Sequence, residues 1–261
     1  MDSTETAELP KIIEQLVASP ARDSMVTDVR IGLGYTAVEL DRSRLGLAYT
    51  FTDSFAGGCE LFERNRSLIG QPAADLVRLV ESGHPIEAAV GFAAANAVVN
   101  SMDREYLDGD VFTFLDLRKE DRVCMVGNFM PIVPRLRTLV SELLIFERIA
   151  EPVDDLIPSE RIGAYLPDSQ VVLLTATALI NHTAEKILKN ADHCREVVIL
   201  GASTPLMPEL YAGLPVTMLS GVVMQDADAV KQIVSQGGGM KSFSRFVRKV
   251  NIRVSSDSGG K

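Results

Sequence analysis

The first hundred residues carry the hydrophobic pattern of a small mixed domain. Apolar residues share one helical face between residues 7 and 18, at Leu9, Ile12, Ile13, Leu16 and Val17. Residues 25–40 and 44–51 alternate well enough to predict paired strands, and glycines punctuate them. Two helices are predicted over 72–82 and 85–100. The second is mostly alanine, so we expect it to be buried and closely packed.

From residue 121 onward the pattern changes to short apolar runs separated by helical stretches. The runs are RVCMVG, ELLIFE, QVVLLTAT, EVVILG and PVTMLSG. Continuous apolar strands alternating with helices are typical of a parallel sheet covered on both faces. We therefore predict an α/β protein. Residues 1–110 form a small α+β domain, and 111–261 form a Rossmann-like doubly wound domain whose last residues, 255–261, are disordered.

Composition and charge narrow the class of protein. The 261 residues are 46% apolar and 23% charged, with a net charge of −9. An acidic chain is a poor partner for nucleic acid or for an anionic membrane surface. No apolar run approaches the roughly 20 residues of a membrane span, and no leader pattern is visible, so we expect a cytoplasmic protein. The one basic patch, residues 241–249, is predicted to be an amphipathic helix that buries Phe243, Phe246 and Val247.

Cysteine and histidine are sparse. Cys59, Cys124 and Cys194 are too widely spaced for a disulfide framework or a CxxC metal motif. Cys124 lies within a predicted strand, and Cys194 precedes another, so both are interpreted as structural, as is His193 beside Cys194. Cys59 follows two glycines, at a loop or helix start where a thiol pKa is lowered. His182 lies in a predicted loop and can face a cleft. Cys59 and His182 are therefore the candidate metal ligands, although each also has an ordinary structural explanation.

Ligands of open parallel sheets bind beyond the carboxyl ends of the strands. The loops expected there are 127–134, 175–183, 201–208 and 220–226, together with Glu147 at the end of its strand. Their polar residues are short hydroxyls and amides: Asn128, Thr175, Thr177, Asn181, Thr183, Ser203, Thr204 and Ser220. Each can simply cap a helix. Together they predict a polar cleft for an anion or a hydroxylated ligand.

The first of these loops excludes one common ligand. GNFMPI, starting at Gly127, lacks the three glycines of a dinucleotide fingerprint and carries a bulky Phe129. Glu147 nevertheless occupies the place of a ribose-binding acid. From the first domain, Asn96 and Asn100 lie one turn apart on a predicted helix and, with Cys59, are candidates for the opposite wall of the cleft.

Three segments together resemble a known family. VGNFMPIVPRL, TATALINHTAEKIL and LGASTPLMPELYAGLPVTMLSGVVMQD, together with GFAAANAVVN, look like motifs of the bacterial and archaeal family labelled putative heavy-metal chelation. The resemblance implies an enolase N-terminal-like domain, a Rossmann-like domain and a ligand site in the cleft between them. Carried over by position, it implies as site residues Gly127, Phe129, Thr177, Asn181, Ser203, Thr204 and Pro205.

Three functional hypotheses remain open. One is a binding protein for a transition metal ion or a metal-containing small molecule, in metal homeostasis or cofactor handling, with carboxylates such as Glu39 or Glu60 assisting Cys59. Another is an enzyme that acts on a small anionic substrate or uses a nucleotide-like cosubstrate such as S-adenosylmethionine. The last is a structural homodimer, which the alanine-rich helix would permit.

Overall fold

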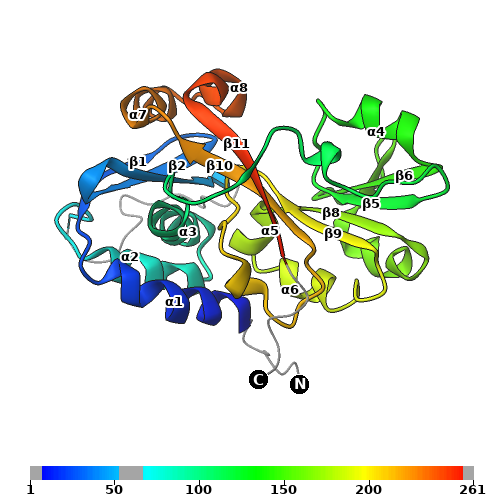
Figure 1. Cartoon of the computed structure of the whole chain (residues 1–261), viewed down its shortest axis with the longest axis horizontal. Helices are drawn as coiled ribbons and strands as arrows, with labels where there is room; N and C mark the ends of the chain where they lie inside the picture. The colour runs from blue at the N-terminus through cyan, green and yellow to red at the C-terminus, as the bar shows by residue number, and fades with distance from the viewer. Residues whose placement is uncertain (1–7, 53–66, 255–261) are drawn as a thin grey trace.

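The computed structural model describes residues 8–52 and 67–254 and shows two sheets packed side by side (Figure 1). The first sheet is antiparallel, with strands in chain order: β1 (Val26–Ile31), β2 (Tyr35–Leu40) and β3 (Arg44–Tyr49). The second has eight strands in the order β4-β11-β10-β9-β8-β5-β6-β7 and is mostly parallel. The predicted α/β class, with a small antiparallel sheet ahead of a larger parallel one, is confirmed.

Three helices cover one side of the small sheet: α1 (Glu8–Ala21), α2 (Ala73–Val77) and α3 (Pro85–Val99). The α3 helix packs directly on β3, where a Cβ at Gly46 would lie 2.0 Å from the carbonyl oxygen of Ala93. Small residues on both elements permit this approach. As predicted, α3 is buried on nearly every face. Its burial leaves little of this helix for contact with a second subunit, and the homodimer stays a prediction.

All five predicted strands of the second half are present: β5 (Arg122–Val126), β6 (Glu142–Glu147), β8 (Val171–Thr175), β9 (Glu196–Leu200) and β10 (Met218–Met224). Three more were not predicted: β4 (Leu107–Asp108), β7 (Leu156–Pro158) and β11 (Val247–Arg253). Strands β5 to β9 pair in parallel, whereas β10 pairs antiparallel with β11, which in turn pairs antiparallel with β4. The helices are short: α4 (Val133–Leu139), α5 (Thr177–Ile180), α6 (Ala184–Leu188), α7 (Ala227–Ser235) and α8 (Met240–Phe243).

Two expectations for the C-terminal part are wrong. The predicted helix over 241–249 ends early, because α8 stops at Phe243 and Val247 begins strand β11. Phe243 and Val247 are buried as expected, but from a helix end and a strand. The predicted loop 220–226 belongs largely to β10, which stays extended to Met224 because β11 supplies an antiparallel partner along its whole length. The hydrogen-bonded ladder overrides the helical periodicity of the sequence.

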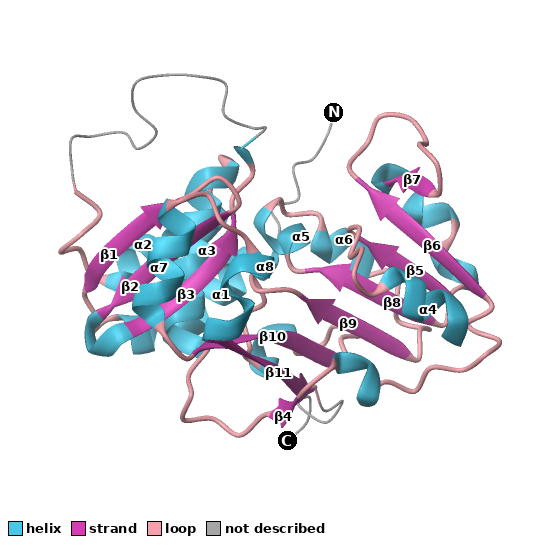
Figure 2. Cartoon of the chain, turned by 90° about the horizontal axis from the view of Figure 1, so that it is seen from above, coloured by secondary structure: helices cyan, strands magenta, loops and turns pink. Residues whose placement is uncertain are grey.

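The two sheets share a core. Helix α7, from the C-terminal half, lies over β1 and β2 of the small sheet (Figures 1 and 2), and its Val230 and Val234 belong to one buried cluster with Ala37 of the small sheet. The Lys231 ammonium lies 2.8 Å from the Glu39 carboxylate of β2 and 3.0 Å from the exposed Asp228 of its own helix. Buried apolar contacts and the largely shielded Lys231–Glu39 ion pair therefore hold the halves together.

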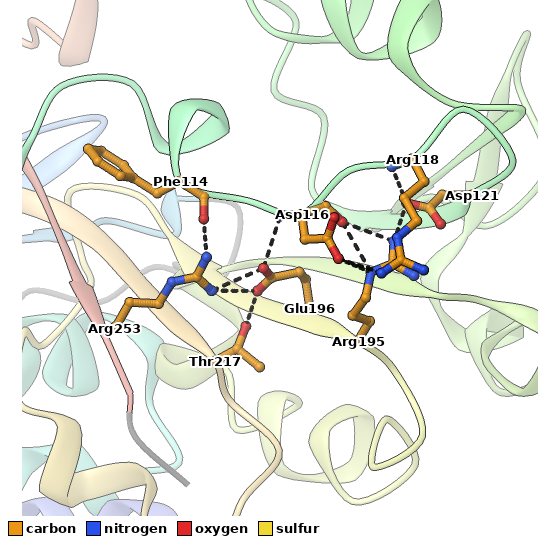
Figure 3. A network of polar contacts seen from close by, with 8 residues as sticks. All are labelled: Phe114, Asp116, Arg118, Asp121, Arg195, Glu196, Thr217 and Arg253. Carbon is orange, nitrogen blue, oxygen red and sulfur yellow. Dashed lines mark hydrogen bonds and ion pairs between the residues drawn. The ribbon is translucent and has the colours of Figure 1, made fainter.

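A polar network closes the amino edge of the large sheet (Figure 3). The buried Glu196 carboxylate accepts hydrogen bonds from Arg253, the Thr217 hydroxyl and the backbone N–H of Asp116. The buried Asp121 pairs with Arg195 at 2.5 Å. The Glu196 carboxylate is satisfied on both oxygens, whereas Asp121 bonds through Oδ2 and its buried Oδ1 has no partner in the described part of the chain.

The predicted structural thiols also lie in this half of the molecule. Cys124 and Cys194 are buried and unpaired, and burial raises the pKa of each to about 11. The His193 ring lies 2.9 Å from the carbonyl oxygen of Leu166. None of the helices in the described part of the chain has the length and apolar character that a membrane span requires.

Candidate functional site

A cavity of about 630 Å³ lies where the small sheet meets the carboxyl ends of the parallel strands. Tyr35, Tyr49 and Phe51 form its wall on the side of the small sheet. The loops after β5, β6, β8 and β9, the segment 159–166 after β7, and the α6 region form the rest of its lining. The volume is typical of a small-molecule site. Sequence reasoning predicted an interdomain cleft at this rim, and the structure places a cavity there.

Eight of the sequence-predicted site residues line this cavity: Gly127, Asn128, Phe129, Glu147, Thr177, Asn181, Thr183 and Ser203. They come from four separate loops, which the parallel strand order brings to one edge. The rule that ligands bind beyond the carboxyl ends of parallel strands, called the strand-end rule below, predicted this group of residues. It required only the positions of the apolar runs along the chain, not the order of the strands in the sheet.

The first loop turns sharply at Gly127, where φ is +91° and an added Cβ would lie 2.9 Å from the Cβ of Thr175. Glycine is required there on both counts. The turn aims the Asn128 backbone N–H at Glu147, whose Oε2 accepts it at 3.0 Å. The Asn128 Oδ1 is buried against the cavity wall and has no partner in the described part of the chain. A buried amide oxygen without a partner is costly unless a bound molecule or water donates to it.

Glu147 lines the cavity and also accepts hydrogen bonds from the backbone of the neighbouring loops. Its Oε1 accepts the backbone N–H of Arg148 at 2.8 Å, so each carboxylate oxygen already holds one backbone donor. Each oxygen keeps a second lone pair, so a ligand hydroxyl can still bind. The predicted ribose-binding role therefore competes with a role in fixing the loop.

Most polar side chains of the loop after β8, residues 175–183, form hydrogen bonds with one another. The hydroxyl oxygens of Thr175 and Thr177 lie 3.0 Å apart, and the Asn181 Oδ1 accepts from both the backbone and the hydroxyl of Thr183. Thr183 occupies the position before α6 without making a side-chain cap. The alternative that these residues simply cap helices is not what the structure shows. The helices behind this loop are also too short to attract an anion by their dipoles.

The loop after β9, residues 201–208, begins at Gly201, where φ is +127°. Ser203 reaches the cavity, and its Oγ accepts the backbone N–H of Tyr49 at 2.9 Å. Thr204 instead donates inward, to the carbonyl oxygens of Gly201 and Ser220, and Pro205 is buried. Neither Thr204 nor Pro205 lines the cavity, contrary to expectation. This turn docks against the small domain, and its first three residues, Gly201, Ala202 and Ser203, line the cavity.

The predicted wall residues Asn96 and Asn100 do not line the cavity either; they clamp this loop from behind. The Asn96 Nδ2 donates to the carbonyl oxygens of Leu47 and Ser203. The Asn100 Nδ2 donates to the carbonyl oxygen of Thr204 at 2.9 Å, and its Oδ1 accepts from the backbone of Leu206 at 2.8 Å. Both asparagines satisfy buried backbone groups that no regular element pairs. They position the loop for the cavity.

Of the two candidate metal ligands, His182 lies in the described part of the chain. His182 adopts a left-handed backbone, φ +59°, and its Nε2 lies 2.9 Å from the Val80 carbonyl oxygen, away from the cavity. Cys59 lies outside the described residues, so its role stays a prediction. Among the residues that the structure describes, no three His, Cys, Asp or Glu side chains are grouped so as to hold a metal ion.

Sequence reasoning missed several cavity residues. Tyr35 and Tyr49 are register partners on β2 and β3, with ring centroids 6.0 Å apart, and Arg148 lies over the Phe51 ring at 5.0 Å. Lys186, on α6, also lines the cavity. Nothing local to these strands distinguishes a cavity aromatic from a core one. The strand-end rule would have reached Arg148, because it directly follows Glu147.

Two family models, both described as putative heavy-metal chelation, match residues 13–99 and 110–253. The chain belongs to that family. The predicted resemblance is confirmed, and the two matches together cover the small sheet and all of the large sheet except β4.

Members of the putative heavy-metal chelation family with solved structures share this fold. A protein of unknown function from Pyrococcus horikoshii superposes with a TM-score of 0.80 at 26% identity, covering 94% of this chain and 100% of that one. One from Desulfitobacterium hafniense gives 0.78 at 22% identity, covering 94% and 98%. An uncharacterized protein of Methanocaldococcus jannaschii is 24% identical over 246 residues, 92% of this chain and 94% of its own. None of these relatives carries an assigned activity in its name.

Proposed function

We propose that this protein binds a metal-containing small molecule in the cavity between the small sheet and the large one, and acts in cytoplasmic metal homeostasis or cofactor handling. The observation that carries the proposal is the cavity itself, about 630 Å³, lined by both halves of the chain. That volume suits an organic ligand better than a bare ion. The family description supports the metal part of the proposal.

A metal complex fits the lining better than a free ion does. Soft transition metals select thiolate and imidazole ligands. His182 faces away from the cavity, and the buried thiols Cys124 and Cys194 lie outside its lining. The cavity does contain Glu147 and Glu160, which can complete the coordination sphere of a metal that arrives inside an organic chelator. The protein would then recognise mainly the chelator.

Thermal unfolding of the purified protein tests the proposal. We expect a rise in Tm with a chelated metal, such as iron(III)–citrate, that exceeds the rise with the same concentration of free nickel, cobalt, copper, zinc or iron. Cys59→Ala is the informative variant. A shift with free metal that this variant abolishes would instead support a bare-ion site at Cys59. Absence of any metal-dependent shift would contradict the proposal.

The position of Glu147 favours a second candidate, an enzyme with a nucleotide-like cosubstrate such as S-adenosylmethionine. Glu147 ends β6 and lines the cavity, where a carboxylate can accept ribose hydroxyls. Under this candidate, S-adenosylmethionine or another nucleotide raises Tm, and Glu147→Gln weakens its binding. A panel of nucleotides that leaves Tm unchanged would remove this candidate and leave the first one standing.

A further inference from the structure

The unused hydrogen-bonding groups of the cavity identify the kind of ligand it suits. Ser203 is 2% exposed, and its Oγ accepts the backbone N–H of Tyr49. A serine hydroxyl can both accept and donate, and no acceptor for its hydrogen is present among the described residues. The cavity is the side from which a ligand acceptor can reach it.

The loop after β8, residues 175–183, has further hydrogen-bond donors without an acceptor. The Thr177 backbone N–H donates to the Thr175 Oγ1 at 3.3 Å, and the two hydroxyl oxygens lie 3.0 Å apart. Only one hydroxyl hydrogen can lie between those oxygens, so the other is free to donate. The Asn181 Oδ1 is occupied by Thr183, whereas the Asn181 Nδ2 has no partner in the described structure.

Two phenols and two cations extend this donor surface. No hydrogen bond joins the hydroxyl of Tyr35 or of Tyr49 to the described residues. Each phenol is protonated at neutral pH and can donate its hydrogen to a ligand acceptor. Arg148 and Lys186 line the cavity without a carboxylate partner in the described ranges 8–52 and 67–254.

Acceptors on the cavity side chains are fewer, and the main ones are the carboxylates of Glu147 and Glu160 and the Asn128 Oδ1. The Asn128 Oδ1 is the buried acceptor without a partner on this wall, as far as the structure describes the chain. Glu147 already holds a backbone N–H on each oxygen. A ligand satisfies the cavity best when it brings many acceptor oxygens and few donors.

We propose that the ligand is an anionic organic molecule rich in carboxylate or phosphate oxygens, bound with its charge toward Lys186 and Arg148. This inference rests on the proposed function and specifies the chelator rather than the metal. A polycarboxylate chelator meets both requirements, because its oxygens coordinate a hard metal and accept hydrogen bonds from the wall.

Calorimetric titration of the full chain tests this inference with probes that separate charge from metal. The anionic probes are iron(III)–citrate, citrate alone and tripolyphosphate. The contrasting probe is nickel(II)–triethylenetetramine, a cationic complex whose chelator offers amines. We expect at least one anionic probe to bind more than about tenfold tighter than the cationic complex, with an affinity that falls as salt rises. The ratio of citrate to tripolyphosphate affinity distinguishes carboxylate from phosphate.

Lys186→Met should weaken the anionic probe about tenfold, the size of one charge-assisted contact. Lys186 is exposed, so the variant should fold normally. Lys241→Met, an exposed lysine on α8 outside the cavity, is the matched control and should change nothing.

The outcomes separate the two proposals. Equal or tighter binding of nickel(II)–triethylenetetramine overturns the anionic ligand and keeps the metal complex. Binding of citrate or tripolyphosphate with no gain from metal supports the anionic ligand and contradicts the metal part of the function. Anionic binding that Lys186→Met leaves unchanged overturns the assignment to this cavity, and failure of every probe to bind overturns both proposals.

Discussion

Asn100 provides the sharpest test of how the cavity is built. Its side chain donates to the carbonyl oxygen of Thr204 and accepts from the backbone N–H of Leu206, and both of those residues are fully buried. Asn100→Ala leaves both backbone groups without a partner. Each buried unsatisfied group costs about 1–3 kcal/mol, so we expect the free energy of unfolding to fall by about 2–4 kcal/mol.

Urea unfolding followed by circular dichroism measures this loss. Asn190→Ala is the matched control, because Asn190 is exposed and its amide donates only to the Lys186 carbonyl oxygen. We expect the control to stay within about 0.5 kcal/mol of the unsubstituted protein. If Asn100→Ala also stays within that margin, α3 does not clamp the 201–208 loop as described.

Three further predictions concern packing, ionisation and thiol chemistry. Gly46→Ala should destabilise the protein by more than about 3 kcal/mol, because α3 leaves no room for a Cβ, whereas Gly83→Ala, with open space around it, should be near neutral in urea unfolding. The pKa of Tyr35, raised to about 12 from 10, means that the folded state holds its phenol proton longer than the unfolded state. Stability should therefore fall from about pH 10 to pH 12, and Tyr35→Phe should lessen that fall in denaturation curves; an unchanged curve would contradict the shift. Cys124 and Cys194 should resist alkylation at pH 8 until the protein unfolds, as mass spectrometry would show, because their pKa values are about 11.

The sequence predicted the structure best at positions where a single physical requirement determines the type of residue. A parallel strand covered on both faces must be apolar throughout, so five strands could be read from apolar runs. A helix that packs this closely on a sheet must present small residues to it. The alanine-rich sequence of α3 therefore made its burial predictable. The strand-end rule then identified the rim of the cavity, including Gly127, Glu147 and Ser203.

The sequence was least informative where partners distant along the chain decide the outcome. Strand β11 forms from helix-like residues because β10 offers it a ladder. Asn96 and Asn100 resemble ligand-binding amides until the turn at 201–208 is seen to need them. Tyr35 and Tyr49 resemble ordinary strand aromatics, and only the meeting of the two sheets makes them a cavity wall. Each of these roles depends on tertiary contacts that local patterns do not encode.

The proposed function places a metal-containing ligand in the cavity between the sheets. An anomalous difference map from crystals grown with iron(III)–citrate, recorded at the iron absorption edge, tests it most directly. We expect an iron peak among the side chains of Tyr49, Glu147 and Lys186. A peak confined to another surface, or a cavity without anomalous density when iron is bound in solution, would contradict it.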